Sequence, residues 1–110
     1  MAAKSSVGEF EEMVLLAMIR LGDRGGLATE IAHELEDRAN RYVSIGALYT
    51  TLDRLEKKGF LTWQIEAHAP ELKGSRKRRF RVTPEGIAAV AARRAALLSL
   101  WDGIEGTLRP

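Results

Sequence analysis

The alternation of apolar and polar positions divides the chain into four helical segments and two strands. Apolar residues recur every three or four positions in 6–22, 27–37 and 44–59, and again from 83 to about 102 or beyond. Ser6, with a glutamate three residues later, has the spacing of a capping box and is expected to begin the first helix. Three helices followed by two strands and a last helix is the order of a winged helix-turn-helix.

Two strands follow the third helix, because apolar and polar residues alternate strictly over 61–66 and 79–83. The core-facing positions are Leu61, Trp63, Ile65, Phe80 and Val82. Trp63 fits a core position better than a platform on which bases stack, since it alternates with two aliphatic residues. Arg79 and Arg81 are expected to face water or a ligand. The residues between the strands form the tip of a wing.

The segment 44–59 is a bounded amphipathic helix with a small, polar outer face. Ser44 is a good N-cap and Gly59 a good helix stop. The inner face is expected to carry Ile45, Leu48, Leu52 and Leu55. Small side chains and hydroxyls on the opposite face suit insertion into a DNA major groove, although an ordinary solvated helix shows the same pattern. The predicted DNA-binding residues are Ser44, Gly46, Ala47, Tyr49, Thr50, Thr51 and Arg54.

Charge is concentrated at the wing. The formal net charge of the 110 residues is only +2, yet the stretch 73–81 contains six basic residues and no acidic one. A polyanion lying against this stretch would relieve its self-repulsion, whereas the plain alternative is a solvated basic loop. The wing residues expected to bind DNA are Lys73, Arg76, Lys77, Arg78 and Arg79.

The first and last helices carry more apolar surface than one small domain can bury. The last helix starts at a Thr83 cap followed by proline, and its apolar stripe approximates a heptad repeat. This predicts dimerisation, and the alternative is a helix folded back over its own core. The predicted dimer residues are Phe10, Val14, Met18, Val90, Leu97, Trp101, Ile104 and Leu108.

Composition excludes several function classes. There is no cysteine, and His33 and His68 stand alone, so neither a metal site nor a cofactor site is expected. Nucleophilic triads and glycine-rich phosphate loops are missing, which argues against an enzyme. The sequence contains no apolar run of about 18 residues, so we expect no membrane partner and a cytoplasmic location.

The sequence resembles the PadR family of bacterial transcriptional regulators from about residue 7 to residue 108. Residues 44–49, Ser-Ile-Gly-Ala-Leu-Tyr, with the following Arg-Leu-Glu at 54–56, look like the recognition helix of that family. Residues 77–86 look like its wing strand and the start of its last helix. Thr50 stands where the family often has proline, and Ala47 where it often has threonine, so the resemblance leaves the operator sequence open.

The resemblance implies a short family member that forms a homodimer through a C-terminal helix swapped across the two-fold axis. Some members bind planar aromatic compounds between tryptophans at the dimer centre. Trp101 is compatible with contact to such a small aromatic effector, while a tryptophan in a dimer seam is more often plain packing.

The sequence therefore predicts a mainly α protein with a small two-stranded antiparallel sheet. Residues 1–83 form a winged helix-turn-helix DNA-binding domain, and 84–110 a C-terminal dimerisation helix of the same compact unit. The predicted function is transcription regulation as a repressor, with double-stranded DNA, a second copy of the chain and a candidate aromatic effector as partners. The alternative is a winged-helix protein-interaction module whose basic wing binds an acidic protein.

Overall fold

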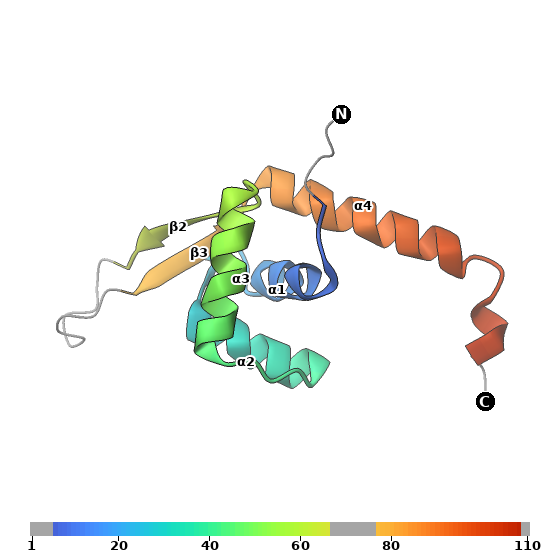
Figure 1. Ribbon diagram of the computed structural model, residues 1–110, viewed down its shortest axis with the longest axis horizontal. Coiled ribbons are helices and arrows are strands. Elements are labelled where there is room, and N and C mark those ends of the chain that lie inside the picture. The colour runs from blue at the N-terminus through green and yellow to red at the C-terminus, as the bar shows by residue number, and fades with distance from the viewer. Residues whose placement is uncertain (1–5, 67–76, 109–110) are drawn as a thin grey trace.

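The computed structural model describes residues 6–66 and 77–108, and the statements below concern these residues. Helices and strands follow the predicted order (Figure 1), and one further short strand lies between the first and second helices. The elements are α1 (Glu9–Arg20), β1 (Gly26–Leu27), α2 (Ala28–Ala39), α3 (Ile45–Lys57), β2 (Leu61–Ile65), β3 (Arg78–Val82), α4 (Pro84–Trp101) and a final 3₁₀ turn, η1 (Glu105–Leu108).

Local capping explains most helix boundaries. The Ser44 hydroxyl accepts a hydrogen bond from the Ala47 N–H at 3.2 Å, and the Thr83 hydroxyl accepts one from the Gly86 N–H at 3.0 Å. Gly59, with φ of 82°, follows the end of α3 in the left-handed region. These bounds confirm the predicted caps of α3 and α4.

Two helix ends differ from the prediction. The N-cap of α1 is Gly8 rather than Ser6, because the Glu11 carboxylate accepts the Gly8 N–H at 2.8 Å. The second helix continues to Ala39, where Asn40 takes the left-handed conformation with φ of 53°. Asparagine tolerates this conformation better than most residues, so the helix ends there without a glycine.

The antiparallel sheet has three strands rather than the predicted two. Their order is β1-β3-β2, with Gly26 opposite Phe80 on one side of β3 and Trp63 opposite Phe80 on the other. A two-residue strand is too short to show alternation, so the sequence pattern did not reveal β1. Gly25 precedes it with φ of 74°, and a Cβ there would collide with the carbonyl oxygen of Phe80.

The core lies where α1, α2 and α3 meet the sheet. Phe80 is fully buried, and Trp63 packs against the core as predicted. Ile45 and Ile65, which were expected to face inward, are exposed instead. Both stand at the ends of their elements, where less of the protein lies over them. The other large, fully buried side chains are Leu15, Met18, Ile31, Leu48, Leu52, Leu55, Leu61 and Val14.

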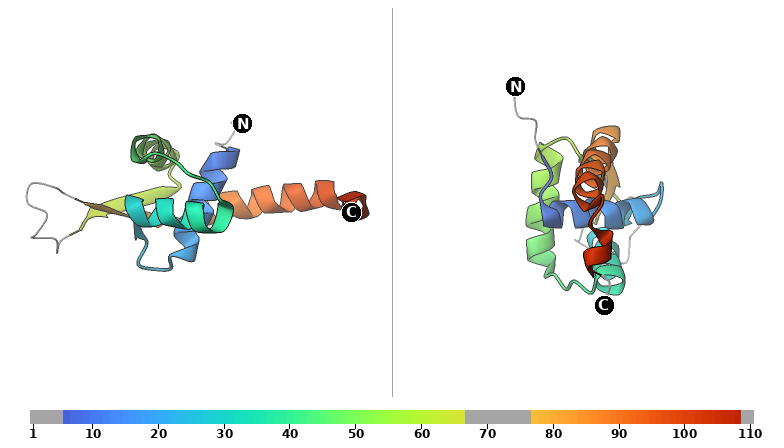
Figure 2. Two further views of the ribbon diagram at one scale, coloured as in Figure 1. Left: turned by 90° about the horizontal axis from the view of Figure 1, so that it is seen from below. Right: turned by 90° about the vertical axis from the view of Figure 1, so that its right-hand side faces the viewer.

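Helix α4 leaves the body on the side away from β2 and β3, as Figures 1 and 2 both show. Its first half packs on α1 through Val90, and its second half extends beyond the other helices. The Cα radius of gyration is 15.9 Å, compared with about 13 Å for a compact domain of this length. The helix ends at Trp101, so Ile104 and Leu108 lie beyond it and do not continue the predicted helical stripe.

Candidate nucleic-acid interface

The exposed face of α3 carries small side chains at its N-terminal end. Gly46, Ala47 and Thr50 are exposed there, and the Thr50 hydroxyl donates to the Gly46 carbonyl oxygen at 3.2 Å. Nothing lies within 4 Å of the place where a Gly46 Cβ would stand. Larger polar side chains follow only in the second half of the helix, at Asp53, Arg54 and Lys57. This face therefore allows another surface to approach the backbone closely.

Two predicted contact residues on α3 do not lie on that face. Thr51 is only 5% exposed because it stands three residues after Leu48 and four before Leu55, both of which face the core. Tyr49 is half-buried, and its ring meets that of Phe80 edge-on, with 6.0 Å between the ring centres. The structure therefore corrects the placement of Thr51, and it gives Tyr49 a packing contact as well as some exposure.

Tyr42 is an exposed aromatic residue that the sequence reasoning missed. It precedes the Ser44 cap by two residues and is 80% exposed. Its neighbour Arg41 stacks on the ring of Phe10, with the guanidinium carbon 4.8 Å from the ring centre. An aromatic residue just before a polar N-cap was the available signal, because a loop gives it no core to face.

Arg78 links the wing to α3. Its guanidinium carbon lies 4.3 Å from the centre of the Trp63 ring and 5.8 Å from that of Tyr49. Its Nη1 atom is also 3.6 Å from Asp53 Oδ1. The aromatic rings and the carboxylate therefore hold the positive charge beside the exposed face of α3.

Arg79, which the sequence predicts to bind DNA, forms ion pairs within its own chain. Its side chain is 14% exposed, and Nε donates to Glu66 Oε1 at 2.7 Å. Nη1 lies 3.7 Å from Glu30 Oε1 and donates to the Gly25 carbonyl oxygen at 3.5 Å. The hydrogen bond with Glu66 raises the pKa of Arg79 above its ordinary value, although burial opposes this. Arg79 therefore joins β3 to α2 and to the residue before β1.

The remaining predicted wing residues are only partly described. Lys77 is half-buried and lines a cleft of about 120 Å³ together with Thr29 at the start of α2. Lys73 and Arg76 lie outside the described residues. The described part of the wing thus offers Lys77 and Arg78 as cations beside α3.

The predicted dimer surface is corrected on α1. Val14 and Met18 are fully buried in the core of their own chain, and Phe10 is half-buried beneath Arg41. The exposed apolar residues of α1 are instead Leu16 and Ile19. Helical periodicity fails here because apolar residues surround most of α1, so several faces satisfy the same spacing.

Of the residues predicted for the dimer interface on and after α4, only Val90 packs into the core. Leu97 and Trp101 on α4 are exposed, and so are Ile104 and Leu108 beyond its end. Three further apolar residues of α4 are exposed, Ile87, Leu98 and Leu100. Leu100 is 74% exposed. An apolar surface of this extent is typical of an interface.

A groove of about 480 Å³ runs between α1 and α4. Leu16 forms its wall on α1, and Leu98 and Trp101 lie on α4. Glu12 and Arg94 supply polar groups to it. Leu16 also lines a second cleft of about 180 Å³ between α1 and α2, so the two hollows share one apolar side chain.

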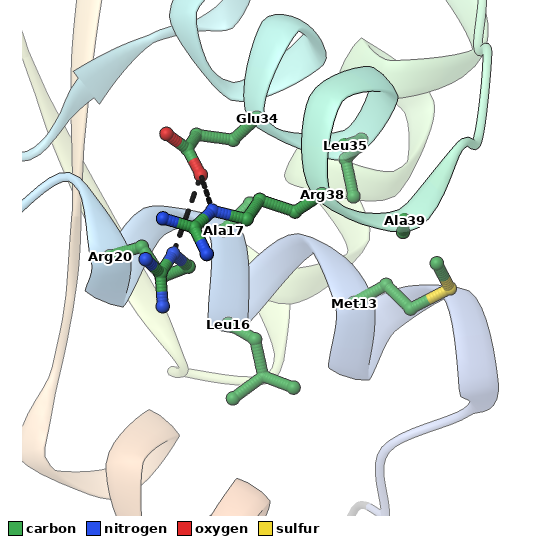
Figure 3. A pocket seen from close by; sticks show the side chains of 8 residues that line it. All are labelled: Met13, Leu16, Ala17, Arg20, Glu34, Leu35, Arg38 and Ala39. Atoms are coloured by element: carbon green, nitrogen blue, oxygen red, sulfur yellow. Dashed lines mark ion pairs between the residues drawn. The ribbon is translucent and has the colours of Figure 1, made fainter.

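The cleft between α1 and α2 is lined by apolar side chains from both helices and by three charged side chains, which lie together in Figure 3. Glu34 Oε1 lies 3.6 Å from Arg20 Nε and 4.0 Å from Arg38 Nε. The Arg20–Glu34 pair joins the C-terminal turn of α1 to α2, whereas the Arg38–Glu34 pair lies within α2.

The described residues contain no group of three or more metal-ligating side chains. Among the helices of the described chain, none combines the length and apolar character needed to span a bilayer.

Residues 15–92 match the model of the transcriptional regulator PadR-like family. The search of curated proteins gave no match.

Solved structures with the same fold include several regulators. A PadR-like transcription factor from Bacteroides fragilis is 19% identical, with a TM-score of 0.72 over 89% of this chain and 88% of that chain. A PadR family transcription regulator from hypervirulent Clostridium difficile is 17% identical, with a TM-score of 0.69 over 92% of this chain and 100% of that chain. RosR of H. salinarum is 23% identical, with a TM-score of 0.67 over 92% and 83%.

Proposed function

Since this chain belongs to the PadR-like family of transcriptional regulators, we propose that it binds an inverted-repeat DNA operator as a homodimer and represses transcription. The observation that carries the proposal is the exposed N-terminal half of α3, with the small residues Gly46, Ala47 and Thr50 on its outer face and Arg78 of the wing beside it. A regulator of transcription acts where the bacterial chromosome lies, so the proposal includes a cytoplasmic location.

Each α3 would enter a major groove with its N-terminal half. Gly46 and Ala47 let the backbone approach the bases, and the Thr50 hydroxyl meets a base edge or a phosphate. Ser44, Tyr42 and Arg54 would contact the flanking phosphates, as would the exposed edge of Tyr49. The contacts with base edges would select the DNA sequence. The contacts with DNA phosphates would fix the position of α3 along the duplex.

The wing would raise the affinity for DNA without contributing to sequence specificity. Arg78 and Lys77 stand beside the exposed face of α3, so a duplex in contact with α3 lies within their reach. Cations that meet phosphates release counterions, which makes binding dependent on salt. The same role is proposed for Lys73 and Arg76. Arg79 is left out because its partners are Glu66 and Glu30.

The homodimer would form through residues 84–110 together with the exposed side of α1. The exposed residues Leu97, Leu98 and Trp101 would pack against the same surface of a second copy, and Leu16 and Ile19 would extend the interface. Two recognition helices related by a two-fold axis read half-sites about 34–36 Å apart, one turn of DNA.

The groove between α1 and α4 is the candidate site for a small aromatic effector. Its volume of about 480 Å³ suits such a ligand, and Trp101 offers a flat ring. A ligand bound there would shift the angle between the two reading heads if it favoured one dimer arrangement. Titration of aromatic compounds against Trp101 fluorescence in a Trp63→Phe variant tests this, and the absence of saturable quenching would reject it.

Selection of bound sequences from a random duplex library tests the main proposal, with the mass of the protein measured in the same buffer. We expect an inverted repeat with half-sites about one turn apart and a species of dimer mass. A folded dimer that enriches no sequence would reject DNA recognition and favour the protein-interaction alternative, in which the basic wing binds an acidic protein. Transcription from the selected operator, with and without the protein, tests repression.

A further inference from the structure

The segment that enters α1, residues 6–12, is held from two sides by basic side chains. Lys58 reaches it from the C-cap of α3, and Arg93 reaches it from the middle of α4. We call this segment the junction. It lies between the helix proposed to read DNA and the helix proposed to form the dimer.

The contact with α3 is short and largely buried. Lys58 Nζ donates to the Ser6 carbonyl oxygen at 2.7 Å and to Glu11 Oε1 at 2.8 Å. Burial raises the pKa of Glu11, but the hydrogen bonds from the Gly8 N–H and from Lys58 outweigh it and hold that pKa below its usual value. The Glu11 side chain is therefore a fixed negative charge that ties α1 to the end of α3.

The contact between the junction and α4 also combines a carboxylate with a backbone carbonyl oxygen. Arg93 Nε donates to Glu12 Oε1 at 2.6 Å, and Arg93 Nη1 donates to the Val7 carbonyl oxygen at 3.2 Å. The Arg93 guanidinium thus donates hydrogen bonds to both a side chain and the backbone of the junction. Charge-assisted bonds of this kind restrict direction as well as distance.

We propose that the Glu12–Arg93 and Glu11–Lys58 pairs fix the angle between α4 and α3, and thereby determine the half-site spacing that the dimer binds. These are positioning residues, and neither Glu12 nor Arg93 lies on the exposed face of α3. The inference rests on the proposed function, because it presumes that α4 joins two DNA-reading copies.

The size of the effect follows from the length of the lever. The part of α4 from Arg93 to Trp101 spans about 12 Å. A rotation of about 16° about the junction would move the far end of this arm by about 3.4 Å, which is the rise between neighbouring base pairs. A loss of angular restraint of this size therefore changes which spacing fits.

The proposal is tested by measuring the affinity of the Arg93→Met variant for a set of operators. The set carries the half-sites selected by the wild-type protein, separated by the selected spacing or by one or two base pairs more or less. We expect the preference for the selected spacing to fall by roughly threefold to tenfold. Affinity for a duplex with a single half-site should stay unchanged.

Glu12→Gln provides a second variant from the other side of the same pair. It should lose the spacing preference to a similar extent, and the double variant should lose little more than either single variant. Arg38→Met is the matched control, because it removes an arginine that pairs with Glu34 within α2. The control should keep the spacing preference. Melting temperature and dimer mass are measured for every variant.

The outcomes separate the inference from the proposed function. If the wild-type protein selects no inverted repeat, the proposed function fails and the inference falls with it. If the wild-type protein selects one spacing, and both Arg93→Met and Glu12→Gln keep that preference as folded dimers, the inference alone is overturned. The same holds if Arg38→Met loses the preference equally.

Discussion

The guanidinium of Arg78 lies 3.6 Å from the carboxylate of Asp53, which connects the wing strand β3 to the exposed face of α3. The next residue, Arg79, turns to the other side of the strand and pairs with Glu66 and Glu30. Adjacent arginines in a strand point to opposite faces, so one can meet a ligand while the other holds the fold together.

Alanine substitutions should distinguish the role of Arg78 in DNA binding from the role of Arg79 in stability. Arg78→Ala should weaken binding to specific and random duplexes alike, and lower the slope of log affinity against log salt by about 0.9, since one phosphate contact is lost. Arg79→Ala should leave the slope unchanged and lower the free energy of unfolding by about 1–3 kcal/mol, because the charge-assisted hydrogen bond between Arg79 and Glu66 is lost. Fluorescence anisotropy across a salt series, with urea unfolding, measures both. An unchanged slope in Arg78→Ala would remove it from the interface.

Gly46 offers a test in which stability and binding move in opposite directions. A Cβ at this position meets nothing within 4 Å, so Gly46→Ala should raise the free energy of unfolding by up to about 1 kcal/mol. The same methyl group should weaken specific DNA binding, because it holds the helix away from the bases. Glu36→Ala, at an exposed position on α2, is the control and should leave DNA affinity unchanged. Undiminished affinity in Gly46→Ala would argue that α3 approaches DNA elsewhere.

Glu11 should make stability depend on pH in the acid range. Its pKa in the folded protein lies below the ordinary value of 4.5, because bonds from Gly8 and Lys58 outweigh the effect of burial. The contribution of the carboxylate is therefore complete above that ordinary value and is lost as the pH falls through the folded-state pKa. We expect Glu11→Gln to be less stable than wild type by about 1–3 kcal/mol at pH 7.

Urea unfolding at several pH values measures this difference, which should shrink below pH 4.5. Glu36→Gln, an exposed glutamate on α2, should match wild type throughout. A difference for Glu11→Gln that stays constant down to the folded-state pKa and below it would show that the charge of Glu11 contributes nothing.

Substitution of Leu97 should impair dimerisation alone, and substitution of Met18 should impair folding stability alone. Leu97 is exposed on α4, so Leu97→Glu should raise the dimer dissociation constant by about thirtyfold or more while the chain stays folded. Met18 is buried in the core, so Met18→Ala should lower the free energy of unfolding by about 2–5 kcal/mol and leave dimer affinity unchanged. Analytical ultracentrifugation and thermal unfolding report the two quantities. A Leu97→Glu protein that remains a tight dimer would exclude α4 from the interface.

The sequence by itself determined where α3 and α4 begin and where β2 and β3 lie. Ser44, Gly59 and Thr83 act within a few residues of their own positions, so their effects follow from local chemistry. The outward placement of Gly46, Ala47, Thr50 and Arg54 follows from helical periodicity, which fixes the relative positions of residues around one helix.

The tertiary structure alone decided which of several apolar faces is covered and which charges are paired. Val14 and Met18 were predicted at an interface, and Leu16 was not, because α1 is apolar on more than one face and only its packing partners choose between them. Thr51 stands between two core leucines, and the exact rotation of α3 against the sheet settles its burial.

Ion pairs between residues far apart in the sequence are even harder to predict from a local sequence pattern. Arg79 meets Glu30 across 49 positions of the chain, and Arg93 meets Glu12 across 81. Charge alone marked Arg79 as a candidate for DNA, yet β1 and α2 bring Gly25 and Glu30 to it. Helix bounds depend on neighbours in sequence, whereas burial and ion pairing depend on neighbours in space, and only the folded chain supplies those.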